Sequence, residues 1–272
     1  MKVTAIIPSL GTEKTRQYLK LCVESLRATV DWDIIVVTNG TKVGEILNDI
    51  SGITLRLHTA DQGQCIATNI GASVAAPNTD YFFISNDDMY YAPGWNKNLR
   101  FDYPVFSPNL VEPTDNNGSA APFLKVPGGY NIEDFKQKAV DKFIADPPTE
   151  PDEPGFNLPF FIKADFWRKL GGYDVAYDPW GSNSDTDLQT RINLAGVTPM
   201  RSRDVLVYHF SNKSGTFDGT HQDFYQNNID YFHDKFGFDR DELGSDVWYN
   251  KDMLPTDPNK IKLKVPKYED IS

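Results

Sequence analysis

The stretch YFFISNDD, residues 81–88, contains the pattern that sets the fold class of this chain. Its apolar half, Tyr81 to Ile84, is a continuous run of the kind that a strand covered on both faces requires. Polar residues follow at once, and the stretch ends in two adjacent carboxylates, Asp87 and Asp88. Strands covered on both faces are typical of parallel sheets, which bind ligands at the carboxyl ends of their strands.

Similar apolar runs precede this stretch and alternate with amphipathic segments. We predict strands at 3–7, 34–37, 54–57 and 81–84, and helices at 13–29, 43–50 and 64–75. This alternation predicts a mainly parallel sheet with helices on both faces, because the crossovers between parallel strands are right-handed. The carboxyl ends of these strands should meet at one edge. Polar or turn-forming residues predicted there include Pro8, Ser9, Thr38, Asn39, Gln62 and Asn86.

The pattern becomes less regular after Pro93. Residues 104–129 are rich in Pro, Asn and Gly, which predicts a long loop. Further on, strands are predicted at 160–162 and 205–208, and helices at 132–145, 165–170, 185–195 and 221–236. We expect one large α/β domain over residues 1–215, followed by a helical extension and tail over 216–272.

Composition limits the classes of function. The chain has 272 residues, 40% of them hydrophobic, so it can bury a sizeable core. A net charge of −11 without a basic run disfavours nucleic-acid binding. The two cysteines do not form a disulfide framework, which favours a cytoplasmic location. No apolar stretch reaches the ~18 residues of a membrane span.

Asn86, Asp87 and Asp88 are the first candidate site. Adjacent carboxylates at the end of a buried strand need something to neutralise them, and Mg²⁺ or Mn²⁺ bridged to phosphates would do so. The alternative is an Asp-rich turn that starts the next segment. The residues themselves favour neither interpretation.

Two further segments contain residues suited to catalysis. Asp185 lies where a helix is predicted to begin; it is either a general base or simply the cap of that helix. His209 follows the last predicted strand and could join a carboxylate in binding Mn²⁺. Lys213, shortly after it, suits a diphosphate.

The order of these segments resembles the family 2 glycosyltransferases. The matching segments are the strand ending in Pro8-Ser9, the strand 34–41, the pattern 62–71, the acidic motif 86–88, the segment 161–174, the motif 185–191 and the strand ending in His209. The resemblance covers roughly residues 3–215. It implies a Rossmann-like, A-type glycosyltransferase fold, with a nucleotide-binding half over 1–93 and an acceptor and catalytic half over 94–215.

The resemblance also implies roles for individual residues. Asp88 would be the main metal ligand, with His209 as a second ligand for Mn²⁺ or Mg²⁺. Asp185 would be the catalytic base that takes a proton from an acceptor hydroxyl. The donor would be a nucleoside diphosphate sugar, with a UDP-sugar slightly favoured. Residues expected to contact this donor are Pro8, Ser9, Thr38, Asn39, Gln62, Asn69, Asn86, Asp87 and Lys213.

The chain departs from the family pattern at several positions. Asn86 stands where the family has the first carboxylate of its Asp-x-Asp motif, and Thr38 replaces the carboxylate that often reads uracil. Ser184 stands where an acid usually precedes the base, and Thr68 where an Arg is usual. Two alternatives therefore stay open: a sugar nucleotidyltransferase, and a non-catalytic module that binds nucleotides or sugars.

Overall fold

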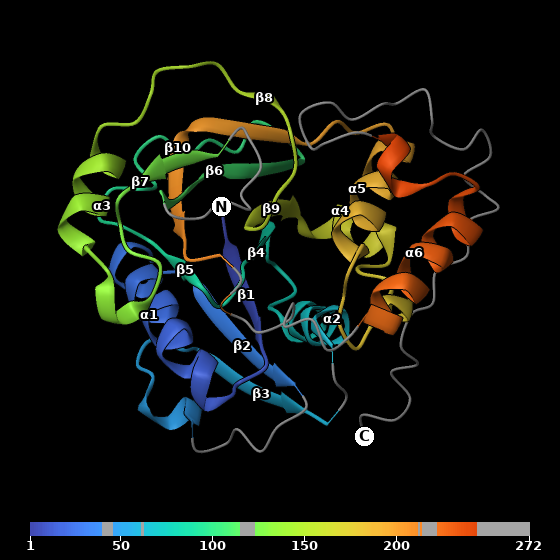
Figure 1. The fold of residues 1–272 in the computed structure, drawn as a ribbon, viewed down its shortest axis with the longest axis horizontal. Helices are drawn as coiled ribbons and strands as arrows, with labels where there is room; N and C mark the ends of the chain where they lie inside the picture. The colour runs from blue at the N-terminus through green and yellow to red at the C-terminus, as the bar shows by residue number, and fades with distance from the viewer. Residues whose placement is uncertain (40–45, 61–62, 115–122, 212, 214–221, 244–272) are drawn as a thin grey trace.

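The computed structural model describes residues 1–39, 46–60, 63–114, 123–211, 213 and 222–243. Within these residues, ten strands form one sheet (Figure 1). The strands are β1 (Val3–Ser9), β2 (Asp33–Asn39), β3 (Leu55–Thr59), β4 (Tyr81–Ile84), β5 (Met89–Tyr90), β6 (Val105–Pro113), β7 (Leu124–Val126), β8 (Glu153–Pro154), β9 (Phe160–Lys163) and β10 (Met200–His209).

Helices flank the sheet. The α-helices are α1 (Glu13–Thr29), α2 (Gln64–Val74), α3 (Gln137–Ala145), α4 (Ala164–Leu170), α5 (Ser184–Leu194) and α6 (Gln222–Phe236). Short 3₁₀ helices are η1 (Ile46–Asp49), η2 (Ile132–Asp134), η3 (Val175–Tyr177) and η4 (Arg240–Leu243). None of the helices in these described ranges is long and apolar enough to cross a membrane.

The predicted parallel sheet is confirmed in the first half of the chain. The main path of the sheet runs β3-β2-β1-β4-β9-β6-β10-β5, and β3, β2, β1 and β4 are all parallel. Strand β9 is antiparallel to both β4 and β6, and β6 and β10 are parallel again. The strands that carry the predicted site therefore end at the same edge of the sheet.

The two faces of the sheet are covered by different helices, as the alternation predicted. Along β1, Ala5 and Ile7 belong to the core beneath α1, whereas Ile6 belongs to the core beneath α2. Helix α2 approaches β1 closely, because a Cβ atom added to Gly71 would lie 2.6 Å from Cγ2 of Ile6. Only glycine allows the helix to pack at this distance.

The prediction of a long loop over 104–129 is wrong for most of the described residues in that range. Strand β6 fills 105–113 and is buried throughout, and β7 pairs with it. The proline content suggested a loop, but Pro108 lies where the register between β6 and β10 shifts, between Ser202 and Leu206. Proline is tolerated in a sheet at such irregularities, because the missing N–H is not needed there.

Other predicted elements are confirmed with changed ends. The helix predicted at 132–145 is divided into η2 and α3. The described part of the helix predicted at 43–50 is η1. Cys22 and Cys65 are both free, as expected, and both are buried.

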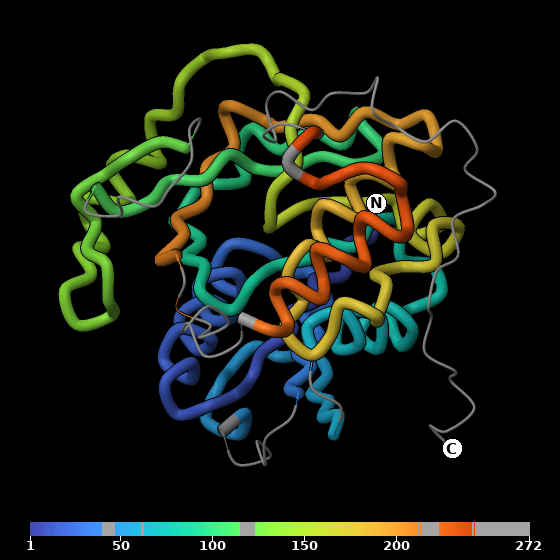
Figure 2. Tube along the Cα trace, turned by 45° about the vertical axis from the view of Figure 1, so that its right-hand side comes forward, coloured from blue at the N-terminus to red at the C-terminus, as the bar shows by residue number. Residues whose placement is uncertain are grey.

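Helix α6 packs on the same core as the sheet. Phe232 is fully buried and Phe236 is 5% exposed, within the core cluster that also holds Ile6. Figure 2 shows α6, in red, lying alongside α5. The assignment of 216–272 to an extension stays a prediction, and within that range α6 contributes to the core of the domain.

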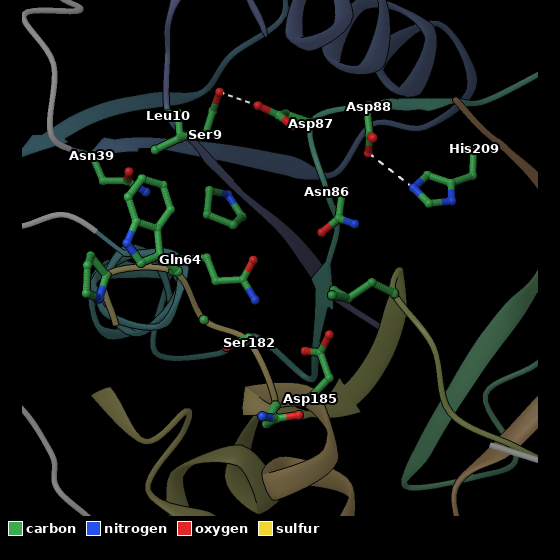
Figure 3. Close-up of a pocket in the computed structure, with 16 residues that line it drawn as sticks. Ser9, Leu10, Asn39, Gln64, Asn86, Asp87, Asp88, Ser182, Asp185 and His209 are labelled. Atoms are coloured by element: carbon green, nitrogen blue, oxygen red, sulfur yellow. Dashed lines mark hydrogen bonds and ion pairs between the residues drawn. The ribbon is translucent and has the colours of Figure 1, made fainter. Parts of the chain in front are cut away.

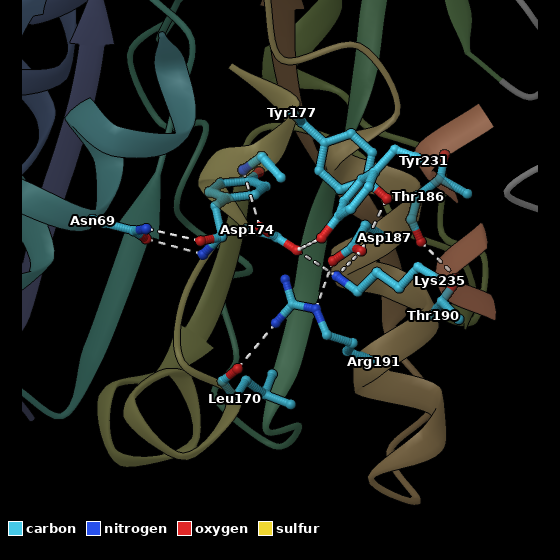
Figure 4. A network of polar contacts seen from close by, with 12 residues as sticks. Asn69, Leu170, Asp174, Tyr177, Thr186, Asp187, Thr190, Arg191, Tyr231 and Lys235 are labelled. Atoms are coloured by element: carbon cyan, nitrogen blue, oxygen red, sulfur yellow. Dashed lines mark hydrogen bonds and ion pairs between the residues drawn. The ribbon is translucent and has the colours of Figure 1, made fainter. Parts of the chain in front are cut away.

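A buried ion network fastens α6 to the segment before α5 (Figure 4). Lys235 contacts both Asp174, at 2.7 Å, and Asp187, while Arg191 Nε lies 2.6 Å from Asp187. The side chain of Lys235 is 3% exposed and both carboxylates are fully buried. Removing one partner from such a network leaves a charge buried without its counterion.

We predict that Lys235→Met destabilises the protein by about 3 kcal/mol, because Asp174 and Asp187 would share one fewer cation in a buried setting. Urea unfolding followed by circular dichroism measures this difference. The matched control is Lys20→Met, since Lys20 pairs with Glu24 on the exposed face of α1. The control should change stability by about 0.5 kcal/mol or less. Equal small losses in both variants would contradict the structural role of Lys235.

Candidate active site

A cavity of about 270 Å³ opens at the carboxyl ends of β1, β2, β4 and β10 and at the start of α5 (Figure 3). It gathers residues that are far apart in the sequence. Eight of the residues predicted from the sequence line it: Pro8, Ser9, Asn39, Asn86, Asp87, Asp88, Asp185 and His209.

Asp87 is buried and held by β1. It is 2% exposed, and Ser9 Oγ donates a hydrogen bond to its Oδ2 at 2.5 Å. Burial, together with the charge of Asp88, raises the pKa of Asp87 to about 7. Two neighbouring carboxylates that cannot both ionise easily form a site that favours a cation.

Asp88 and His209 lie next to each other in the cavity wall. Its Oδ1 lies 3.4 Å from His209 Nε2, and its Oδ2 accepts a hydrogen bond from the backbone N–H of Lys213. Burial favours the neutral acid, but the charge of His209 and these contacts outweigh it and hold the pKa of Asp88 below its ordinary value. Asp88 is therefore ionised in a buried setting.

A second carboxylate orients the imidazole from behind. Glu112, near the end of β6, lies with Oε1 3.0 Å from His209 Nδ1, and its Oε2 is 3.2 Å from Lys125 Nζ. Burial tends to lower the pKa of His209, but Asp88 and Glu112 outweigh it and raise that pKa to about 10. With Nδ1–H directed at Glu112, the other nitrogen, Nε2, is the one that faces Asp88.

This pair fits a divalent cation. Oδ1 of Asp88 is buried, and its 3.4 Å contact with Nε2 of His209 is too long and poorly aligned to satisfy it fully. A histidine that binds a metal usually has its other ring nitrogen bonded to a carboxylate or carbonyl. Glu112 occupies that position beside Nδ1 of His209. Within the described ranges, no group of three or more His, Cys, Asp or Glu side chains has an arrangement that could hold a metal ion without other ligands. Mg²⁺ and its analogues commonly take few protein ligands and complete their shell with phosphates and water.

Asp185 lies in the first turn of α5, on the opposite side of the cavity. Tyr173 Oη donates a hydrogen bond to its Oδ1 at 2.7 Å. Asn69 fixes the backbone of Tyr173 from α2 with two bonds, from its Nδ2 to Tyr173 O at 2.8 Å and from Tyr173 N to its Oδ1 at 2.9 Å. The position of Asp185 is thus fixed through Tyr173 and Asn69.

The loop before α5 is tied to the start of α2. Asp178 accepts hydrogen bonds from the backbone N–H groups of Cys65 and Ile66, at 3.2 and 2.8 Å. Burial is the main cause that raises the pKa of Asp178 to about 6, against these hydrogen bonds. Gln64 Nε2 also donates to Ser184 Oγ at 3.2 Å. These contacts fix the loop that supplies one wall of the cavity.

Four predicted residues lie outside the cavity wall or outside the described ranges. Thr38 is fully buried and close to His58 Nδ1, at 3.2 Å. Asn69 uses its amide on Tyr173, as described above. Lys213 lies with Nζ 3.0 Å from Asn131 Oδ1, beside Asp88 rather than in the wall. Gln62 falls outside the described residues.

Several residues of the site were not predicted. Glu112 was missed because β6 was interpreted as a loop; recognising the strand would have placed this carboxylate at the active edge. The cavity wall also contains residues that were not among the predicted site residues. These are Leu10, Gln64, Leu158, Pro179, Trp180, Gly181, Ser182 and Asn183.

Residues 4–100 match the sequence model of the family described as glycosyl transferase family 2. The matched segment runs from β1 to beyond Asp88, so it includes the cavity residues of β1, β2 and the acidic motif and stops before Asp185 and His209. None of the curated proteins matches the chain in sequence.

Solved structures extend the likeness beyond the family segment. The structure of S. aureus TarS 1–349 is 13% identical with a TM-score of 0.52, over 79% of this chain and 62% of that one. GalNAc-T7, solved with UDP, GalNAc and Mn²⁺, is 17% identical with a TM-score of 0.52, over 77% of this chain and 44% of that one. At these identities the likeness shows the fold alone, which is the A-type glycosyltransferase fold.

We predict that Asp88→Asn weakens Mn²⁺ binding by at least about tenfold, because the amide keeps the shape but removes the charge that a hard cation needs. Electron paramagnetic resonance counts free Mn²⁺ in a titration of the protein. Asp165→Asn is the matched control, since Asp165 is exposed on α4. An unchanged Mn²⁺ affinity in Asp88→Asn would overturn the assignment of Asp88 as a ligand.

Proposed function

We propose that this protein is a metal-dependent glycosyltransferase that transfers a sugar, with inversion, from a nucleoside diphosphate sugar to an acceptor hydroxyl. The observation that supports this most is the composition of one cavity. A candidate metal pair, Asp88 and His209, and a candidate base, Asp185, line the same space from three separate elements.

The nucleotide would bind at the carboxyl ends of β1, β2 and β4, which lie within the segment that matches the family. Ser9, Asn39 and Asp87 line the cavity, and we assign to Asp87 a contact with the ribose or the donor sugar. A divalent cation held by Asp88 and His209 would neutralise the diphosphate and stabilise the charge that develops on it as it leaves. The backbone N–H of Lys213 bonds to Asp88, and its ammonium group, now at Asn131, would have to turn toward the phosphates to contribute its charge.

The chemical step is a single displacement. The acceptor oxygen forms a bond to the anomeric carbon while the bond from that carbon to the diphosphate oxygen breaks. Asp185 takes the acceptor proton, and the nucleoside diphosphate leaves with the electron pair. Tyr173 holds Oδ1 of Asp185, which limits rotation of the carboxylate and fixes its direction toward the cavity.

A UDP-sugar is the donor that we favour. The GalNAc-T7 structure, which shares the fold, contains UDP and Mn²⁺. In this chain Thr38 replaces the carboxylate that often reads uracil, so Asn39, whose side chain lines the cavity, is the polar group closest in sequence to that role. A thermal-shift comparison of UDP-, GDP-, dTDP- and CDP-sugars with Mn²⁺ tests the choice: the UDP-sugar should give the largest shift.

We predict that Asp185→Asn reduces Mn²⁺-dependent transfer, or hydrolysis of the donor when water is the acceptor, by about 10²- to 10⁴-fold. The amide cannot take a proton, but it preserves the shape of the site, so affinity for the free nucleoside diphosphate should stay within about twofold. Release of nucleoside diphosphate measures turnover, and calorimetry measures binding. Asp165→Asn again serves as the surface control.

Unchanged turnover in Asp185→Asn would remove the base assignment. Formation of pyrophosphate from a nucleoside triphosphate and a sugar phosphate would instead favour nucleotidyl transfer. A wild-type protein that binds the nucleotide sugar but never releases nucleoside diphosphate would be a binding module.

A further inference from the structure

Asn183 lies directly before α5 and forms part of the cavity wall. It is 8% exposed, and no motif drew attention to it. Its Oδ1 accepts a hydrogen bond from Arg240, whose guanidinium NH1 lies at 2.6 Å. Since a guanidinium can only donate, the amide oxygen must face Arg240, and the orientation of the amide is determined.

The other end of this amide has no partner among the described residues. Nδ2 of Asn183 is buried and donates to none of the residues that the structure describes. Buried amide N–H groups in folded proteins nearly always have an acceptor, either in the protein or in a bound molecule. Nδ2 of Asn183 is therefore a hydrogen-bond donor, fixed in the cavity wall, that can bond to an acceptor on a bound molecule.

The backbone does not explain why an asparagine is needed. Asn183 has φ +67°, in the left-handed region, and its carbonyl accepts the N–H of Asp187 at the start of α5. Glycine adopts this conformation more easily than asparagine and would make the same backbone bond. The contribution that is specific to asparagine is its amide.

The surroundings of the amide indicate the class of ligand. Asp185, the proposed base, is two positions further along and lines the same cavity, as do Ser182 and the indole of Trp180. An aromatic face beside small polar groups suits a sugar, which presents apolar C–H groups and hydroxyl oxygens together. A sugar hydroxyl oxygen is an acceptor that Nδ2 can use.

We propose that Asn183, oriented by Arg240, donates a hydrogen bond to a hydroxyl oxygen of a sugar bound next to Asp185. This assignment rests on the proposed function. Asn183 would then be a specificity residue. It would favour a donor or acceptor sugar that carries this hydroxyl over a ligand that lacks it. The nucleotide portion of the donor would bind toward Ser9 and Asn39, away from Asn183.

Asn183→Gly tests the assignment, because it removes the amide and keeps the left-handed backbone. Calorimetry with Mn²⁺ gives the dissociation constants of UDP-glucose, GDP-mannose and dTDP-glucose and of UDP, GDP and dTDP. For the pair that the wild type binds best, we expect the variant to lose about tenfold in affinity for the nucleotide sugar. Affinity for the free nucleoside diphosphate should be unchanged.

Two controls accompany the variant. Asn78→Gly makes the same replacement at an exposed turn before β4, at the other edge of the sheet, and should change neither affinity. Melting temperatures of both variants establish that they fold. If the donor sugar is unaffected, the Michaelis constants of glucose, galactose, mannose and N-acetylglucosamine as acceptors are compared; a rise of about tenfold in Asn183→Gly assigns the contact to the acceptor sugar.

Different binding results would overturn the role of Asn183 and the proposed function. A wild type that binds nucleotide sugars, with an Asn183→Gly variant that matches it for every donor and acceptor, overturns the role of Asn183 alone. An equal loss for UDP and UDP-glucose also overturns it, because the contact would then lie on the nucleotide. A wild type that binds no nucleotide sugar overturns both.

Discussion

The buried pair of Asp87 and Asp88 at the end of β4 is the constraint on which the site depends. Both carboxylates are 2% exposed, so each needs a compensating partner. Ser9 donates to the first, and the backbone of Lys213 with the imidazole of His209 serves the second. These partners come from β1 and from the end of β10, so the ends of separate strands converge where negative charge is concentrated.

The opposite wall depends on contacts from elements that are remote in sequence. Asn69 on α2 holds Tyr173, Tyr173 holds Asp185, and Asp178 returns to cap α2. Lys235 on α6 then contacts Asp187 on α5 and Asp174 in the segment before it. Helix α5 therefore has little freedom to move away from the acidic pair. Such rigidity suits a reaction in which a base and a leaving group must be held on either side of one carbon.

The first half of the fold could be predicted because its signals are local: apolar runs such as Tyr81 to Ile84 specify strands, and Asp88 follows directly. The second half could not, because tertiary contacts decide it. Proline 108 marks an irregularity in a buried strand rather than a loop, and this hid Glu112. Asn69 looked like a nucleotide contact, yet its amide bonds to Tyr173, over a hundred residues away. No local sequence pattern predicts a hydrogen bond between residues so far apart in the sequence.

In the proposed function, Asp88 and His209 would hold one metal ion that also binds the diphosphate in this cavity. Pulsed electron paramagnetic resonance of the Mn²⁺ and UDP complex tests it directly, since it detects nuclei bound to the metal. We expect couplings to phosphorus of UDP and to a histidine nitrogen, with the nitrogen coupling lost in His209→Ala. Phosphorus coupling without any histidine nitrogen in the wild-type protein would contradict this arrangement.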